Sequence, residues 1–573
     1  MRASTYVVPS LLLLAACGPS RLELASRYPI VPQPSWLAAG DGAFMVDAET
    51  RIVLGDPRDP ELRRMAERFA APARAAAGVP LSVADQAAAG PLRNVVILRL
   101  VPDPATGMAV QETRGAEAEA YDLRVTREAV ELVGRTHAGV FRGLQTLRQL
   151  MPVEVEDRFR ALAPWGGAST LGARPASATA ALRIPAVDIS DAPRFPYRGM
   201  HLDVGRHFFP VEFVKKYIDL LALYRMNTFH WHLTEDQGWR IEIRRYPRLT
   251  EVGSCRAETI LEKNFDPFVG DGVPYCGFYT QAEIREVVAY ARERHILVIP
   301  EIEMPGHSVA ALAAYPELAC TEGPFEVHTR WGVTPDIYCP KEETFEFLQA
   351  VLEEVMQLFP SPYIHIGGDE APKERWEESP VAQEVIRREG LADEHELQSW
   401  FVQRIERFLN ANGRRLIGWD EILEGGLAPN ATVMSWRGME GGIDAARQGH
   451  DVIMTPVSHV YFDYYQAEPD GEPLAICCFT PLEKVYGFEP VPGELAADEA
   501  PHVLGAQGNV WTEYMTTPEH VEYMALPRML ALSEVVWSPR DLRDWESFRV
   551  RLEAQLPRLD ALDVNYRRPE WAR

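Results

Sequence analysis

Two patterns of hydrophobic and polar positions divide the chain near residue 180. Upstream, short apolar runs lie at 94–98, 121–125 and 129–133. They alternate with two helical stretches, an alanine-rich one at 59–77 and a second at 139–151. The runs 121–125 and 129–133 are separated by a short turn, as in a β-hairpin. We therefore predict a small α+β domain over residues 28–180. Its last part, 163–180, is rich in Gly, Ala, Ser and Thr and is expected to be an exposed excursion.

From residue 195 onward, strand-like runs alternate with longer stretches whose apolar residues recur at three- and four-residue spacing. The strand-like runs are 198–203, 226–232, 296–301, 363–367, 415–420, 432–436, 451–455 and 503–509. The helical stretches are 211–225, 280–295, 342–359, 394–412 and 518–536. Eight strands with crossover helices predict an α/β fold, a (β/α)8 TIM barrel over residues 195–560. An open doubly wound sheet is disfavoured, because no glycine-rich phosphate loop follows the first strand.

In such a barrel, chemistry takes place where the strands end, in the loops of the C-terminal face. Acidic and aromatic residues recur at these ends: Asp203, His232, Glu301, Asp369, Glu370, Trp419, Asp420, Glu421, Trp436, Tyr461, Asp463, Trp511 and Glu513. Indole rings stack on the apolar faces of sugars, and carboxylates accept hydrogen bonds from hydroxyls in fixed directions. The set therefore favours a carbohydrate site.

Two adjacent acids, Asp369 and Glu370, follow one predicted strand after two glycines. A polar loop that caps the strand would explain a lone Asp-Glu pair. Glycoside cleavage instead needs one acid to protonate the leaving oxygen, and usually a second carboxylate across the sugar. Adjacent side chains leave a strand in different directions, so the two acids need not flank one bond. We expect one of them to be a general acid, with a pKa raised by its neighbour's charge and by partial burial.

Five ordered segments resemble those of family 20 glycoside hydrolases, the β-N-acetylhexosaminidases. They are RGMHLDVGRHFFP (198–210), NTFHWHLTEDQGWRIEI (227–243), PEIEMPGH (300–307), HIGGDE (365–370) and GAQGNVWTE (505–513). The stretches EAYDLRV and AGVFRGLQTLRQL are similar to the small domain that precedes the barrel in that family. The resemblance covers nearly the whole mature chain. It implies an exo-acting hydrolase of terminal, non-reducing GlcNAc or GalNAc residues.

The resemblance also implies a retaining, substrate-assisted mechanism. The acetamido oxygen of the sugar would attack its own anomeric carbon and give an oxazolinium intermediate, which is favoured because the two groups are already held together. Glu370 would be the general acid and then the base that activates water. Asp369 would hold the acetamido N–H and stabilise the positive charge that develops there.

The remaining site residues are carried over by the same resemblance. Arg198 would grip the sugar hydroxyls at positions 3 and 4, Tyr461 would donate to the acetamido oxygen, and His307 would support Glu370. The other implied sugar-binding residues are Trp419, Trp436, Asp463, Trp511 and Glu513. Glu235 and Glu303 stand where well-known members carry Asp, so the spacing around His307 and Glu370 must differ.

Two other readings compete with this one. His230 and His232 form an H-x-H at a strand end, where alternation places both on one face, as in metal-dependent amidohydrolase barrels. Such sites need a bridging lysine and further histidines, whereas the later strand ends here offer Asp, Glu and Trp. The second alternative is a non-catalytic sugar-binding lipoprotein, which is disfavoured because both Asp369 and Glu370 are present. No cluster has zinc-ligand spacing, and we expect neither a metal nor a cofactor.

The net charge and the first residues of the chain indicate which partners it binds and where in the cell it is located. A formal net charge of −25 disfavours a nucleic-acid partner. Residues 1–17 predict a lipoprotein signal peptide: Arg2 precedes a leucine run, and Leu14-Ala15-Ala16-Cys17 resembles a bacterial lipobox, whose cysteine is lipidated. Plain secretion is the alternative. We expect export, with a lipid anchor at Cys17 as the sole membrane contact, in the outer membrane or periplasm of a Gram-negative cell. The sequence leaves the oligomeric state open.

Six further cysteines are compatible with disulfides in an exported protein. Cys255 with Cys276, and Cys320 with Cys339, are spaced to close short loops. Cys477 and Cys478 are adjacent, and we do not expect them to bond to each other.

Overall fold

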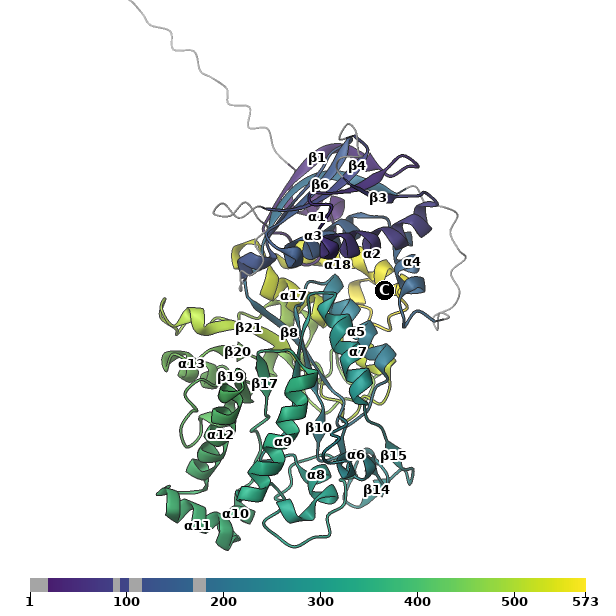
Figure 1. Cartoon of the computed structure of the whole chain (residues 1–573). Coiled ribbons are helices and arrows are strands. Elements are labelled where there is room, and N and C mark those ends of the chain that lie inside the picture. Colours follow the sequence, from purple (N-terminus) through teal and green to yellow (C-terminus); the bar gives the residue numbers. More distant parts are fainter. Residues whose placement is uncertain (1–18, 86–92, 102–115, 168–181, 573) are drawn as a thin grey trace, which may run out of the picture.

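The computed structural model describes residues 19–85, 93–101, 116–167 and 182–572, which form an N-terminal unit seated on a barrel (Figure 1). The N-terminal unit is a seven-stranded mixed sheet in the order β1-β7-β5-β6-β4-β2-β3. Its strands are β1 (Trp36–Met45), β2 (Arg51–Leu54), β3 (Ser82–Asp85), β4 (Val95–Leu100), β5 (Tyr121–Val125), β6 (Ala129–Gly134) and β7 (Arg183–Asp191). Its helices are α1 (Arg21–Arg27), α2 (Pro60–Ala77), α3 (His137–Leu150) and α4 (Glu154–Leu162).

The apolar faces of α2 and α3 pack on this sheet and form the core of the unit. The predicted hairpin is the antiparallel pair β5–β6, in which Leu123 lies opposite Leu132. The small α+β domain is therefore confirmed. β7 extends it beyond residue 180, because this strand pairs with β1 on one side and β5 on the other.

Eight parallel strands close the barrel, which confirms the predicted (β/α)8 fold. They are β8 (Tyr197–Asp203), β9 (Thr228–His232), β16 (Leu297–Glu301), β17 (Tyr363–His365), β18 (Arg415–Trp419), β19 (Thr432–Ser435), β20 (Val452–Met454) and β21 (Val503–Gly508). The larger helices around them are α5 (Val211–Leu223), α7 (Gln281–Arg292), α9 (Glu342–Leu358), α12 (Glu394–Ala411), α13 (Glu440–Arg447), α16 (Pro518–Ala525), α17 (Arg528–Trp537) and α18 (Trp545–Ala561). The predicted helix 518–536 is two helices, because Pro527 interrupts it.

Loops on the C-terminal face carry most of the short elements. The strands are β10 (Thr234–Glu235), β11 (Gly238–Trp239), β12 (Cys255–Arg256), β13 (Ile260–Phe265), β14 (Phe268–Gly270) and β15 (Tyr275–Cys276). The short helices are α6 (Arg248–Glu251), α8 (Val309–Ala314), α10 (Glu374–Glu378), α11 (Pro380–Glu389), α14 (Val457–Val460) and α15 (Leu482–Tyr486). Among the residues that the structure describes, no helix is both long and apolar enough to cross a bilayer. Cys17 lies outside those residues.

Buried carboxylates of the N-terminal unit bind arginines of the barrel. Glu119 Oε2 accepts a hydrogen bond from Arg198 Nη2 of β8 and another from Arg142 Nε of α3 in its own unit, each at 2.6 Å. Asp191 Oδ2 lies 3.2 Å from Arg225 Nη1. Burial opposes the charge of Glu119, but Arg198 and Arg142 lower its pKa to about 2. The two units are therefore joined by buried charge pairs in addition to apolar contact.

Arg198 belongs to this interface, and the prediction that it grips sugar hydroxyls is wrong. It is the second residue of β8, at the amino end of the strand, and its side chain is completely buried. Besides Glu119, its guanidinium donates to the carbonyl oxygens of Phe195 and Arg225, both at 2.9 Å, and it lies over the ring of Trp537. The catalytic face is at the opposite end of the strands, so Arg198 cannot reach a sugar bound there.

Disulfides join Cys255 to Cys276 and Cys320 to Cys339, as their spacing allowed. A third joins Cys477 to Cys478, so the expectation that these two do not bond is wrong. Cys478 has a φ of 59°, in the left-handed region, and this turn of the backbone brings the two side chains together.

Candidate active site

The two adjacent acids follow β17 through a turn that only glycine can make. Gly367 and Gly368 have φ of 68° and 88°, and Glu370 itself has φ of 38°. A Cβ on Gly367 would lie 1.8 Å from Glu303 Oε2, so any side chain there would displace that carboxylate. The positive φ values reverse the chain at the strand end and hold Asp369 and Glu370 in fixed, different directions.

Asp369 and Glu370 lie in different environments. Asp369 is buried, and its Oδ1 has no hydrogen-bond partner among the described residues. The side chain of Glu370 is 41% exposed, which shows that the site opens to solvent on its side. The two acids are therefore suited to different tasks, one inside the pocket and one at its opening.

We expected the general acid of the pair to have a raised pKa, but the raised pKa belongs to Asp369 and not to Glu370, the acid that the resemblance implies. Burial, together with the charges of Glu301 and Glu370, raises the pKa of Asp369 to about 7, although His307 opposes this. The hydrogen bond from His307 lowers the pKa of Glu370. Without a bound sugar, a proton shared by the pair therefore resides on Asp369.

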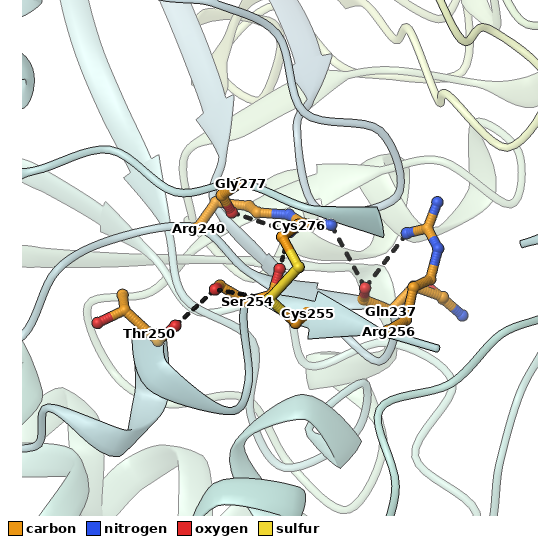
Figure 2. Close-up of a disulfide and its surroundings, with 8 residues drawn as sticks. All are labelled: Gln237, Arg240, Thr250, Ser254, Cys255, Arg256, Cys276 and Gly277. Carbon is orange, nitrogen blue, oxygen red and sulfur yellow. Dashed lines mark hydrogen bonds between the residues drawn. A yellow bond between two sulfur atoms is a disulfide. The ribbon is translucent and has the colours of Figure 1, made fainter. Parts of the chain in front are cut away.

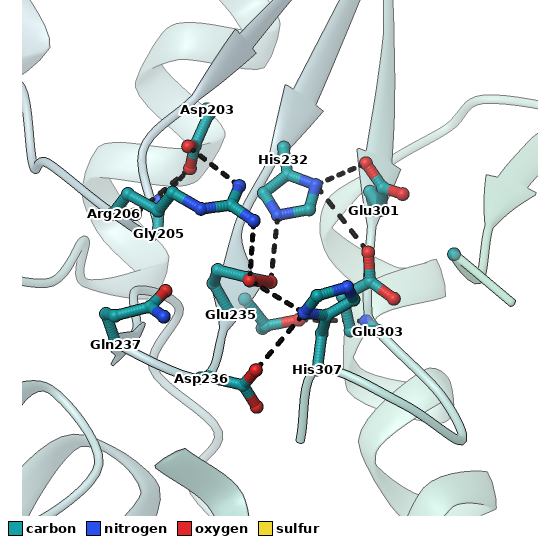
Figure 3. Close-up of polar contacts among 12 residues, drawn as sticks. Asp203, Gly205, Arg206, His232, Glu235, Asp236, Gln237, Glu301, Glu303 and His307 are labelled. Carbon is teal, nitrogen blue, oxygen red and sulfur yellow. Dashed lines mark hydrogen bonds and ion pairs between the residues drawn. The ribbon is translucent and has the colours of Figure 1, made fainter. Parts of the chain in front are cut away.

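His307 connects the pair to a buried acidic cluster, whose contacts with His307 are drawn in Figure 3. Its Nδ1 lies 2.9 Å from Glu235 Oε1 and 3.1 Å from Asp236 Oδ2. Its Nε2 lies 3.4 Å from Glu370 Oε2 and 3.7 Å from Asp369 Oδ2. Burial opposes protonation of His307, but Glu235, Asp236 and Glu370 raise its pKa well above the usual value. His307 is therefore a cation, and it contacts Glu370.

Arg206 is the arginine that the sequence analysis missed. It lies beyond the end of β8, buried between Asp203 Oδ2 at 3.2 Å and Glu235 Oε1 at 2.8 Å (Figure 3). Glu513 Oε1 lies 3.5 Å from Arg206 Nε. Its guanidinium also lies 5.1 Å from the ring centre of Trp511. The signal was present: RGMHLDVGRH holds two arginines, and only the second follows the strand end.

Glu235 and Glu303, the two longer acids, are in different charge states. Glu235 reaches both Arg206 and His307, and these cations lower its pKa well below the usual value in spite of burial. Glu303 has no hydrogen-bond partner for either carboxylate oxygen among the described residues. Burial and the neighbouring Asp369 raise its pKa well above the usual value. Glu303 is therefore a neutral acid beside Asp369.

The predicted aromatic residues gather in one wall. Trp419 lies 5.7 Å from Trp511, ring centre to ring centre, and Trp436 stacks with Tyr461 at 6.2 Å and 25°. Trp419 Nε1 donates to Glu301 Oε1 at 2.8 Å, which fixes its ring. Such a wall presents flat apolar faces to a ring-shaped ligand.

Two predicted hydroxyl-binding acids, Asp463 and Glu513, lie near Arg206 and carry buried, unpaired oxygens. Asp463 Oδ1 and Glu513 Oε2 have no hydrogen-bond partner among the described residues. Burial raises the pKa of both, with Glu513 adding to the effect at Asp463 and Asp203 adding to it at Glu513. Buried polar oxygens without partners are costly, and hydroxyl groups of a ligand would satisfy them.

The H-x-H motif lies deeper in the barrel. His230 Nε2 lies 3.0 Å from Glu301 Oε2, and His232 Nδ1 pairs with the same oxygen, so both histidines do share one face. Gln507 Nε2 donates to His230 Nδ1 at 3.1 Å. Among the described residues, four groups of three acid or imidazole residues are close enough to hold an ion, including His201–His230–Glu301 and His307–Asp369–Glu370. His230 and His307 are already paired with carboxylates, whereas His201 accepts a hydrogen bond from the backbone N–H of Val510.

The comparison with known families fits this site. Residues 195–540 match the model of the glycosyl hydrolase family 20 catalytic domain, and residues 27–192 match that of domain 2 of the same family. The chain belongs to glycosyl hydrolase family 20. In this family 20 chain, the matched regions correspond to the barrel and to the N-terminal unit with β7 included.

Named relatives and solved structures agree with this assignment. The β-hexosaminidase of Porphyromonas gingivalis is 47% identical over 94% of this chain and 64% of its own length. The chain thus spans less than two thirds of that relative. The β-N-acetylhexosaminidase of Cellulomonas fimi is 30% identical over 94% of this chain and 95% of its own. The exo β-N-acetylglucosaminidase of Vibrio harveyi in complex with N-acetylglucosamine superposes with a TM-score of 0.78, at 33% identity, over 95% of this chain and 79% of that one.

Proposed function

We propose that this chain is an exo-acting β-N-acetylhexosaminidase that removes terminal, non-reducing β-linked GlcNAc or GalNAc. The observation that carries the proposal is the division between the buried Asp369 and the partly exposed Glu370, with the His307 cation against both. The aromatic wall and the unpaired oxygens of Asp463 and Glu513 add a surface for one sugar ring. The family relatives that carry hexosaminidase names support the same activity.

In the proposed reaction the substrate supplies the nucleophile. The acetamido oxygen forms a bond to the anomeric carbon while the bond to the leaving oxygen breaks, and Glu370 gives its proton to that oxygen. Asp369 accepts the acetamido N–H and stabilises the positive charge on the oxazolinium ring. Water then attacks the anomeric carbon, returns a proton to Glu370, and opens the ring with retained configuration. Arg206, Asp463 and Glu513 would bind the hydroxyls.

The pKa order requires the proton to move when the sugar binds. In the free enzyme Asp369 holds it, whereas the reaction needs it on Glu370. An acetamido N–H that donates to Asp369 favours the ionised form of that carboxylate, and the bound sugar shields Glu370 from water. His307 lies within 3.7 Å of both carboxylates and can carry the proton between them. Substrate binding therefore places the proton on Glu370, the general acid.

We expect kcat/KM to fall as the pH rises through about 7, the pKa of Asp369. Below that pH the free pair holds the one proton that Glu370 must deliver. Above it both carboxylates are ionised, and no proton is available for the leaving oxygen. The check is the pH profile of kcat/KM with a poor leaving group. A constant kcat/KM from about pH 6 to about pH 9 would contradict the shared proton.

A panel of aryl β-glycosides tests the function itself. We expect hydrolysis of the 2-acetamido sugars and a loss of at least about 10³-fold for matched sugars without that group, since the internal nucleophile is gone. The product released first should be the β-anomer, which NMR detects. Equal rates with and without the acetamido group would refute substrate assistance.

We further propose that the enzyme is exported and lipid-anchored at Cys17. The support is the lipobox-like sequence alone. A Cys17→Ser protein should move from the membrane fraction to the soluble fraction, and one that stays with the membranes would contradict the anchor.

A further inference from the structure

Exposed apolar side chains are concentrated on one loop of the barrel's C-terminal face. Six of the thirteen exposed large apolar residues of the described chain lie between residues 261 and 278: Leu261, Phe265, Phe268, Val269, Val273 and Phe278. We call the segment from Cys255 to Cys276 the disulfide hairpin; β14 and β15 mark it in Figure 1. Single exposed apolar residues are ordinary, but a contiguous set indicates a contact surface.

The root of the disulfide hairpin is fixed to the active site. Cys255 and Cys276 are register partners of β12 and β15 and are joined by their disulfide (Figure 2). Arg256, one residue beyond Cys255, is buried and donates from Nη1 to the carbonyl oxygen of Arg206 at 2.7 Å. Arg206 is the arginine that binds Glu235 and Glu513. The root of the hairpin, in the loop after β9, is therefore tied to the loop after β8 that holds Arg206.

The tip of the disulfide hairpin contacts the loops around the pocket. Lys263 Nζ donates to the carbonyl oxygen of Ile476 at 2.7 Å and lies 5.5 Å from the ring centre of Tyr514, the residue after Glu513. Phe265, the last residue of β13, follows Lys263 by two residues and belongs to the same tip. Phe265 and Phe268 are register partners across β13 and β14, and cross-strand partners share a face.

Phe265 and Phe268 are thus 39% and 38% exposed and lie together at the hairpin tip, which Lys263 holds beside Tyr514. We propose that Phe265 and Phe268 form a platform for the aglycone, the part of the substrate beyond the cleaved sugar. This inference rests on the proposed function. A terminal sugar held in the pocket leaves its aglycone outside, on the side where Glu370 is exposed. Neighbouring rings of a β-linked oligosaccharide present apolar C–H faces that stack on phenyl groups.

The charges on the disulfide hairpin set the class of aglycone. Glu258, Glu262, Asp266 and Asp271 lie on it, with Lys263 as the single base between residues 257 and 274. An anionic aglycone would be repelled by this surplus of negative charge, whereas an uncharged one is not affected. The platform is therefore suited to neutral sugar chains.

The test compares two substrates that share the same terminal sugar. One is the methyl β-glycoside of GlcNAc, which has no aglycone to reach the platform, and the other is a β-linked GlcNAc oligomer. In the double variant Phe265→Ser/Phe268→Ser we expect kcat/KM for the oligomer to fall about five- to thirtyfold, through KM, because two ring contacts are lost. The value for the methyl glycoside should change less than about twofold.

Val381→Ser is the matched control, since Val381 is 45% exposed on α11 and should affect neither substrate. Equal losses for the two substrates, or no loss for the oligomer, would overturn the platform. Loss of affinity for neutral phosphatidylcholine vesicles, with hydrolysis unchanged, would assign the rings to a membrane instead. If wild type cleaved neither substrate, the proposed function would fail. The platform would then be judged by oligomer binding to wild type and to the double variant.

Discussion

Glu370→Gln is expected to lower kcat by about 10²–10⁴-fold on substrates with a poor leaving group, the range usual for the loss of a general acid. Glutamine keeps the size of the side chain but has no proton to give to the leaving oxygen. On a dinitrophenyl glycoside, whose leaving group departs without protonation, the first step should be nearly unchanged. The measurement is a set of aryl glycosides of graded leaving-group pKa, analysed as log kcat/KM against that pKa.

The slope of that plot separates loss of the acid from general damage. In Glu370→Gln it should be steeper than in wild type, because negative charge builds up on a leaving oxygen that receives no proton. Glu374→Gln is the control, an exposed glutamate at the start of α10, and its slope should match wild type. A Glu370→Gln enzyme that cleaved poor leaving groups at the wild-type rate would remove Glu370 from the acid role.

The barrel could be predicted because it follows from local rules. Eight buried strands alternate with amphipathic helices, and each strand lies within a few residues of its predicted range. Asp369 and Glu370 could be placed as well, since a strand end in this fold marks the catalytic face. The extent of the N-terminal unit was missed because β7 pairs with strands far away in the sequence, which no local pattern reveals.

The protonation of the acid pair could not be predicted from the sequence. Adjacent carboxylates suggested only that one of the two would hold a proton, and which one does depends on which of them is buried and on where His307 lies. His307 comes from another strand end, more than sixty residues away, and only the closed barrel brings it against Glu370. Its contact with Glu370 lowers the pKa of that group, which adjacency alone would raise.

The role of Arg198 was predicted wrongly for a different reason, since the rule that places catalytic residues at the carboxyl ends of barrel strands was already available. Its predicted strand begins at residue 198, so the barrel rule already put it at the amino end, away from the catalytic face. The motif contains Arg206 eight residues later, past the strand end. Position along the strand should therefore have decided between the two arginines.

Exchanging each arginine for glutamine should separate the two roles. In Arg206→Gln, the buried carboxylates of Asp203, Glu235 and Glu513 lose their shared cation. We expect kcat/KM on an aryl 2-acetamido glycoside to fall at least about 30-fold, since removing one partner of a buried charge pair costs about 2–5 kcal/mol. The pH profile should also shift, because Arg206 lowers the pKa of Glu235, which in turn raises that of His307.

Arg198→Gln should instead act on stability, by about 3–5 kcal/mol of unfolding free energy, because Glu119 stays buried with one cation fewer. In wild type, Arg198 and Arg142 hold the pKa of Glu119 at about 2, below the ordinary 4.5, so this contribution is present at neutral pH and is lost as the pH falls from about 4.5 toward 2. Urea unfolding of wild type and variant at neutral and acidic pH measures this contribution, and the difference in unfolding free energy between them should shrink in acid.

The folded fraction of Arg198→Gln should keep kcat/KM within about threefold of wild type, since Arg198 does not reach the catalytic face. A stable Arg198→Gln protein that had lost catalysis would return the sugar-binding role to Arg198 and overturn the assignment of Arg206.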